Sequence, residues 1–303
     1  MRHSSSIYLI LTASLALSCG GGADQQQSTD KAPPLVIGGD DASAKASSLY
    51  QMPTPNELFR IIRDLDGKGQ KSALSAPMKA DRFATLRARS LNFGVYATDM
   101  VYASNFTITS EVVRYYLACK DLGGQLGLTS TFSPEMQRRL EKNITHGDSL
   151  DVLTNDAYYS AYQKLQEENM GPVLTLVLAG GWVESMHLVM SKVESYDAGN
   201  AIVDRIAEQK VSLEQLLDMM EAQKDDENVG PMRLKLMAIR DIYDQLNVVR
   251  KAHDGVSPSG RMVLGEDVSV SLTAEKYNEL KSAVGKLREE ITRPEDAASN
   301  NRS

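Results

Sequence analysis

One stretch of sequence constrains the fold more than any other: LVLAGGWVESMH, from Leu176 to His187. A second stretch, LNFGVYATDMVY from Leu91 to Tyr102, has the same character. Both are apolar on nearly every side of a helix, which is typical of a buried central helix. Both also contain interior glycine, which costs about 1 kcal/mol relative to alanine. Glycine at such positions usually allows close approach of another backbone, so we expect two tightly packed central helices.

Each of these stretches carries one acid, Asp99 in the first half of the chain and Glu184 in the second. An unpaired charge is expensive to bury, so both acids need partners or a raised pKa. Tyr96, Tyr102 and Arg89 are the candidate partners nearest in sequence. Two interpretations are open: a polar site between the helices, or a buried network that fixes their register.

Glu184 and His187 stand three residues apart, which is the Glu-x-x-His spacing of dimetal helical bundles. Such a site needs a second copy of the motif, and neither His146 nor His253 has Glu three residues before it. We therefore expect no dimetal site, no cofactor and no metal in the favoured interpretation. A mononuclear site of Asp99, Glu184 and His187 remains an alternative.

The same region is not expected to cross a membrane. Its apolar part, residues 172–183, is shorter than the roughly 20 residues of a transmembrane helix. Glu184 and His187 follow within one turn and would be costly in lipid. The pattern favours a core helix of a water-exposed protein.

Helical periodicity and helix caps continue through most of the chain after residue 52. An apolar stripe predicts a helix over 55–65, and a longer one is expected over 81–106. Ser133 and Thr273 are predicted N-caps. Gly123-Gly124 is a predicted helix stop, and Ser212 is predicted to begin a new helix through a capping box.

These patterns together predict an all-α fold. We expect an irregular bundle of about eight to ten helices. The last helix before the C-terminal one is predicted to run from Gly230 to about Arg250. A small β-hairpin is expected near 262–271, with residues 263–264 pairing with 268–270.

The N-terminal region has a different character. Arg2 is followed by an apolar stretch, Ile7 to Leu17, and then by the pentad LALSC that ends at Cys19. This is a secretory signal pattern. The pentad resembles the lipobox of bacterial lipoproteins. That resemblance implies cleavage before Cys19, a diacylglyceryl group on its thiol and an acyl group such as palmitate on its new amino group.

The predicted domain organisation follows from that cleavage site. Residues 1–18 are the signal peptide, and 19–51 are the lipidated cysteine and a disordered tether of low complexity. Residues 52–293 form the helical domain, and 294–303 form a flexible tail. Cys119 is then the one unmodified cysteine, which excludes an intrachain disulfide and predicts a small buried apolar residue.

The net negative charge of the chain limits the kinds of partner that we expect it to bind. The chain has 33 Lys and Arg against 40 Asp and Glu, and removal of Arg2 gives 32 − 40 = −8. Such a surface does not favour nucleic acid. The partners expected are the lipid bilayer, through acylated Cys19, and an envelope protein.

The leading hypothesis is a non-enzymatic lipoprotein of the cell envelope that serves as a helical interaction or scaffold module. Gly20 rather than Asp follows Cys19, which favours an outer membrane where the cell has one. The segment from Asn92 to Asp99 is similar to uncharacterised helical lipoproteins of the Bacteroidota, and this similarity implies no activity.

One alternative function is that of a binding protein with a polar pocket of Asp99, Trp182, Glu184 and His187. The other is a metal-dependent enzyme at the same place.

Overall fold

The computed structural model describes residues 55–143, 147–252 and 266–295. These residues belong to one compact unit that spans Lys45–Ser303. The predicted signal peptide and the predicted tether, with Cys19, lie outside the described residues.

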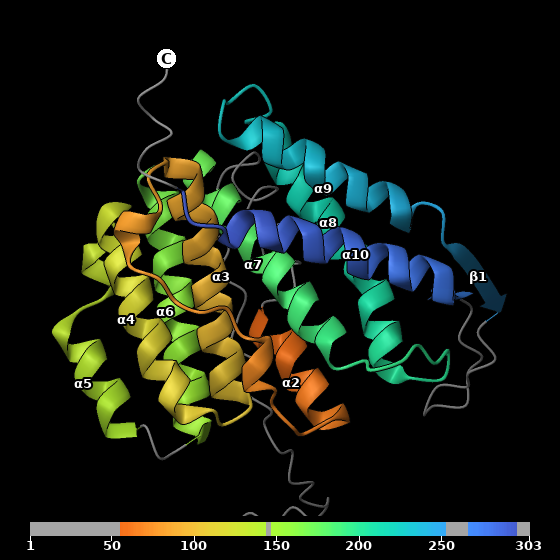
Figure 1. The fold of residues 1–303 in the computed structure, drawn as a ribbon, viewed down its shortest axis with the longest axis horizontal. Coiled ribbons are helices and arrows are strands. Elements are labelled where there is room, and N and C mark those ends of the chain that lie inside the picture. Colours follow the sequence, from red (N-terminus) through yellow and green to blue (C-terminus); the bar gives the residue numbers. More distant parts are fainter. Residues whose placement is uncertain (1–54, 144–146, 253–265, 296–303) are drawn as a thin grey trace, which may run out of the picture. The chain divides into compact units, whose positions relative to one another are not determined.

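The described part of the chain is mostly helical, as predicted, with nine α-helices in the expected range of eight to ten (Figure 1). Three short 3-10 turns and a two-stranded hairpin complete it; the turns are η1 Lys71–Ala73, η2 Ala80–Arg82 and η3 Thr129–Thr131. The α-helices are α2 Pro55–Leu65, α3 Leu86–Asn105, α4 Thr109–Gln125, α5 Pro134–Asn143, α6 Gly147–Glu167, α7 Gly171–Ser191, α8 Ala201–Glu221, α9 Val229–Tyr243 and α10 Ala274–Thr292.

The core is built around α3 and α7, the two helices predicted to be central. Nearly every residue of both helices is buried. They pack against each other, and between them they contact α2, α4, α6, α8 and α10. Figure 1 shows α10, in blue, beside α9 and in front of α7.

Glycine allows α3 and α7 to cross in backbone contact. A Cβ added at Gly94 would lie 2.0 Å from the Val177 carbonyl oxygen. A Cβ added at Gly180 would lie 2.1 Å from the Leu91 carbonyl oxygen. Both distances are far below van der Waals contact, so no larger residue fits at either position. This confirms the close backbone approach that the interior glycines indicated.

Two of the predicted helix caps are present. The Ser133 hydroxyl accepts the Met136 N–H at 3.2 Å, and the Thr273 hydroxyl accepts the Lys276 N–H at 3.2 Å. The predicted start of the long helix at Asp81 was too early, because Asp81 lies in the 3-10 turn Ala80–Arg82. Thr85 caps α3 instead, and its side chain accepts the Ala88 N–H.

Two predicted helix boundaries were wrong because tertiary packing overrides the local signal. Gly123 and Gly124 lie inside α4, and Gly123 packs beside the Phe132 ring. Ser212 lies inside α8 rather than at a cap, since the buried stripe of that helix continues through it. Residues 201–221 therefore form one helix where two were expected.

The hairpin is present with a different partner strand. Strand β2, Glu266–Ser271, contains the predicted residues 268–270 and pairs antiparallel with β1, Asn247–Ala252. We had assigned the first part of β1 to the preceding helix, which ends at Tyr243. The other predicted strand, residues 263–264, lies outside the described residues.

Glu295 extends the ordered part of the domain beyond the predicted boundary at residue 293. Its carboxylate accepts the N–H groups of Ala84 and Thr85 at 2.7 and 2.8 Å. It also accepts the Thr85 hydroxyl at 2.9 Å. An acid at this place satisfies free N–H groups at the start of α3 and interacts favourably with the helix dipole.

One described helix, α7, is long and apolar enough to cross a membrane by length and composition. However, 94% of its most apolar window is buried inside the protein. Such burial is typical of a core helix.

Candidate functional site

The two acids flagged in the sequence meet in the interior. Asp99 on α3 and Glu184 on α7 follow the glycine crossing by about one helical turn, and both are fully buried. The negative charge of Glu184 and a side-chain hydrogen bond with it are among the causes that raise the pKa of Asp99. A hydrogen bond between two carboxyl groups requires a proton on one of them, because an ionised carboxylate can only accept.

Asp99 is the acid that holds this proton. Its Oδ2 accepts the Ser75 N–H at 3.2 Å, and its Oδ1 has no hydrogen-bond donor among the described residues. Burial, followed by the adjacent negative charge of Glu184, raises the pKa of Asp99 well above its usual value. A proton on Oδ1 would make this atom a donor toward Glu184.

Arg288 on α10 binds Glu184 with two hydrogen bonds. Arg288 Nε lies 2.6 Å from Glu184 Oε2, and Nη2 lies 2.9 Å from Oε1. The side chain of Arg288 is 18% exposed and that of Glu184 is not exposed at all. Bidentate pairs of this kind are strong and geometrically specific.

A segment between α2 and α3 packs against the site. We call residues 70–78 the covering segment. Arg288 Nη2 donates to the Ser75 hydroxyl at 2.7 Å and to the Ala73 carbonyl at 3.2 Å. The Tyr115 hydroxyl donates to the Ser75 carbonyl. The polar cluster of Asp99, Glu184 and Arg288 therefore joins α3, α7, α10 and the covering segment.

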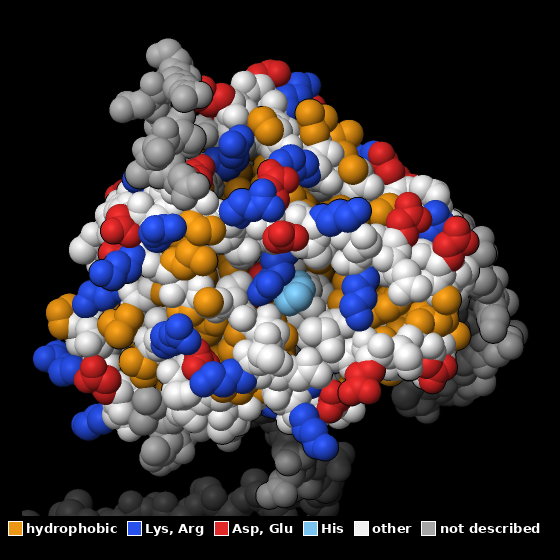
Figure 2. Space-filling view, viewed as in Figure 1, with side chains coloured by type: hydrophobic (Ala, Val, Ile, Leu, Met, Phe, Trp, Pro, Cys, Tyr) orange, Lys and Arg blue, Asp and Glu red, His pale blue; other side chains and the backbone are white. Residues whose placement is uncertain are grey.

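His187 belongs to the edge of this cluster rather than to its centre. It is partly exposed, and its Nε2 lies 3.2 Å from the Ala73 carbonyl, to which it must donate. Burial and then the positive charge of Arg288 lower its pKa. Figure 2 shows a histidine at the surface of the face that it draws, with Lys or Arg side chains nearby.

The mononuclear metal alternative does not fit this geometry. Both carboxylate oxygens of Glu184 are bound by Arg288, and Nε2 of His187 donates to a carbonyl. Among the described residues, no group of three His, Cys, Asp or Glu side chains is arranged to hold a metal ion.

Trp182 lies away from the acids and lines a different cavity, with Ser185 of α7 and Gln209 and Ser212 of α8. Residues two apart on a helix project in nearly opposite directions, so Trp182 and Glu184 face different neighbours. The four residues of the predicted pocket therefore do not share one pocket. The i, i+2 spacing was the signal that could have shown this in the sequence.

The nearby partners expected for the acids bind elsewhere. Arg89 Nε donates to the Phe83 carbonyl, and the Tyr96 and Tyr102 hydroxyls accept backbone N–H groups of the covering segment. The partner that the sequence reasoning missed is Arg288. Its basic side chain sits among the apolar positions of an amphipathic helix, which was the one available signal.

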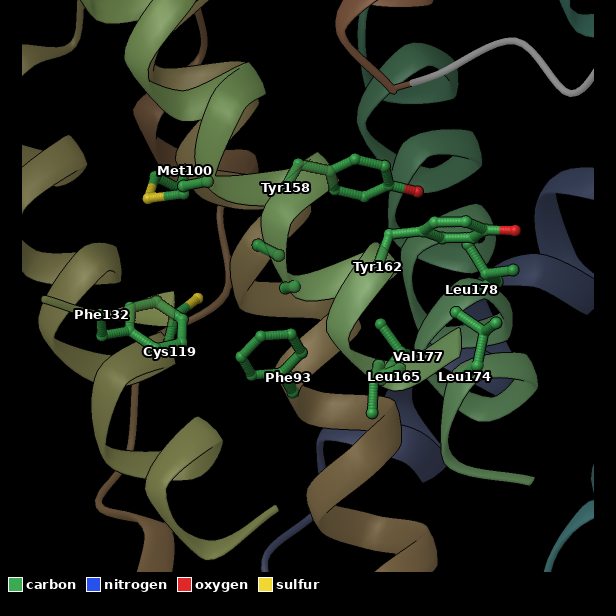
Figure 3. Close-up of a pocket in the computed structure, with 13 residues that line it drawn as sticks. Phe93, Met100, Cys119, Phe132, Tyr158, Tyr162, Leu165, Leu174, Val177 and Leu178 are labelled. Atoms are coloured by element: carbon green, nitrogen blue, oxygen red, sulfur yellow. The ribbon is translucent and has the colours of Figure 1, made fainter. Parts of the chain in front are cut away.

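Cys119 is buried and its thiol is free. It lines an apolar cavity of about 20 Å³, beside the Phe132 ring (Figure 3). Burial raises the pKa of this thiol, which keeps it protonated and unreactive.

No protein-family model, curated protein or solved structure matches this chain.

Proposed function

We propose that this protein is a lipid-anchored component of the cell envelope whose helical body acts as an interaction module. The observation that carries the proposal is the pentad LALSC, which ends at Cys19 behind the apolar stretch Ile7–Leu17. Two or three acyl chains on Cys19 would hold the protein stably, because each buried CH₂ contributes roughly 0.8 kcal/mol. Gly20 favours the outer membrane as the destination in a cell that has one.

The arrangement of the buried acids favours a structural role for them over a catalytic one. A general acid or nucleophile has to reach a substrate. Asp99 and Glu184 are fully buried, and their oxygens bind Ser75 and Arg288. The cluster therefore acts as a structural tie between helices.

The surface of the body supports a protein that stands in water beside the membrane. Charged side chains of both signs alternate with small apolar patches on the face in Figure 2. Among the described helices, α7 is the one apolar enough to enter lipid, and it is enclosed by other helices. In this proposal the bilayer is contacted through Cys19 and not through the body.

Fractionation of the native cell tests the anchor. Wild-type protein should sediment with membranes and enter the detergent phase, and it should incorporate labelled palmitate. The Cys19→Ser variant should lose all three properties, whereas Cys119→Ser should retain them. Equal membrane association of Cys19→Ser and wild type would refute lipid anchoring.

In-cell cross-linking tests the role as an interaction module. Membrane-bound wild type should give a reproducible cross-linked product with one envelope protein, and soluble Cys19→Ser should give much less of it. Recovery of no envelope partner, with confirmed cross-linker activity, would count against this role and leave the anchor intact.

A further inference from the structure

A second, uncharged cavity lies on the other side of α7 from the acids. It has a volume of about 30 Å³ and is partly enclosed. Helices α2, α6, α7 and α8 all contribute side chains to it. Those that matter here are Leu58, Tyr158, Trp182, Ser185, Gln209 and Ser212.

Two polar side chains of this lining are left without a partner. Trp182 is 5% exposed and Ser212 is 3% exposed. Within the described part of the chain, neither the Trp182 Nε1 atom nor the Ser212 hydroxyl has a hydrogen-bond partner. Each such group costs about 1–3 kcal/mol when it is buried unpaired, and native interiors rarely leave two beside one cavity.

The composition of the lining restricts what could satisfy them. Among the described residues, no Asp, Glu, Lys or Arg lines the cavity. An ionised ligand would lose its hydration without gaining a counter-charge, which is strongly unfavourable. Trp182 offers only a donor, so a ligand must present an acceptor to it.

We propose that this cavity, the Trp182 pocket, binds a small neutral molecule that has an apolar body and a carbonyl or hydroxyl oxygen. The oxygen accepts the Trp182 indole N–H and pairs with the Ser212 hydroxyl, while Leu58 and the ring of Tyr158 contact the apolar body. The cavity exceeds the roughly 10–15 Å³ that one water molecule needs. It therefore holds about two water-sized groups, such as the oxygen-bearing end of a longer molecule.

The chain contains a single tryptophan, so one indole N–H signal reports on the pocket directly. The purified body can be titrated with N-methylacetamide, a neutral carbonyl compound, and with acetate, an anion of similar size, while that signal is followed by NMR. We expect a saturable shift with N-methylacetamide and none with acetate.

Two serine variants provide the comparison. Ser212→Ala should weaken N-methylacetamide binding about fivefold, the effect of one lost hydrogen bond. Ser282→Ala, which removes an exposed hydroxyl of α10, should leave binding unchanged. A linear shift that is equal for both probes, or no shift because the cavity holds water only, would overturn the proposal. Either outcome is independent of Cys19 and leaves the proposed anchor untouched.

Discussion

Asp99 and Glu184 form a buried acid pair, in which burial and the negative charge of Glu184 raise the pKa of Asp99. Arg288 binds that charge through two hydrogen bonds of 2.6 and 2.9 Å. The three side chains together are neutral, which explains how two acids can be buried between α3 and α7. Four predictions rest on this acid pair and on the close crossing of α3 and α7.

Asp99→Asn should be nearly neutral. The amide oxygen can accept the Ser75 N–H, and the amide NH₂ can donate to Glu184 as the protonated acid does. We expect a free energy of unfolding within about 1 kcal/mol of wild type at neutral pH. Asp99→Ala should instead lose about 2 kcal/mol or more, because it leaves the Ser75 N–H buried without a partner. Urea unfolding measures both, and equal large losses would show that Asp99 is ionised in the native protein.

Glu184→Gln should behave very differently from Asp99→Asn, although both change one carboxyl to an amide. It leaves the Arg288 guanidinium without a counter-charge, and breaking a buried pair in this way costs about 3–5 kcal/mol. Adding Arg288→Met should recover much of that loss, because no unpaired charge then remains. A double variant as unstable as the single one would contradict the pairing. Thermal and urea unfolding of the three proteins supply the comparison.

The acid pair also predicts a pH dependence of stability. The pKa of Asp99 is raised on folding above its usual value of 3.8. At pH values between 3.8 and the raised pKa of the folded state, Asp99 is protonated in the folded protein and ionised in the unfolded chain. The free energy of unfolding must therefore fall as pH rises through that window, by at most about 1.4 kcal/mol per pH unit. The stabilisation is fully present below pH 3.8 and is lost as pH passes the raised pKa.

Asp99→Asn isolates this contribution. Asp66 and Glu111, whose pKa values are lowered by Lys192 and Lys71, give the opposite slope, but they are common to both proteins. The difference in unfolding free energy between wild type and Asp99→Asn, measured at a series of pH values, should shift against wild type as pH rises. A flat difference, or one of opposite sign, would show that the proton is not on Asp99.

The glycines at the α3–α7 crossing should tolerate no side chain. Gly94→Ala and Gly180→Ala place a Cβ about 2 Å from a carbonyl oxygen, so the central helices must separate. We expect losses of about 3 kcal/mol or more, by analogy with severe overpacking of a core. Gly124→Ala and Gly285→Ala are matched controls, since a Cβ there meets nothing within 4 Å. These helical controls should gain up to about 1 kcal/mol. Similar melting temperatures for all four variants would contradict the close crossing.

Most features that depend on neighbouring residues could be predicted from the sequence. The bounds of α2, the caps at Ser133 and Thr273, and the burial of α3 and α7 all follow from periodicity and hydrogen-bonding chemistry. The pairing of Asp99 with Glu184 was also within reach. Asp99 lies five residues after Gly94, and Glu184 lies four residues after Gly180. Once the glycines mark the crossing, both acids fall about one turn beyond it.

The features that could not be predicted from the sequence depend on tertiary contacts. Arg288 meets Glu184 because α10 packs on α7, and no local pattern specifies that packing. Ser212 has the spacing of a helix cap, yet it lies inside α8 because packing of the buried stripe outweighs the cap. The end of α9 was misplaced because residues 247–252 pair with β2 as strand β1, and the local pattern did not show this pairing.

The intact mass of the native protein, extracted from membranes, tests the central functional claim most directly. The account predicts a polypeptide that begins at Cys19 and carries a diacylglyceryl group and an amide-linked acyl chain. Digestion should place both on the N-terminal peptide. A mass equal to the unmodified chain with residues 1–18 still present, or a processed chain with an unmodified cysteine, would contradict it.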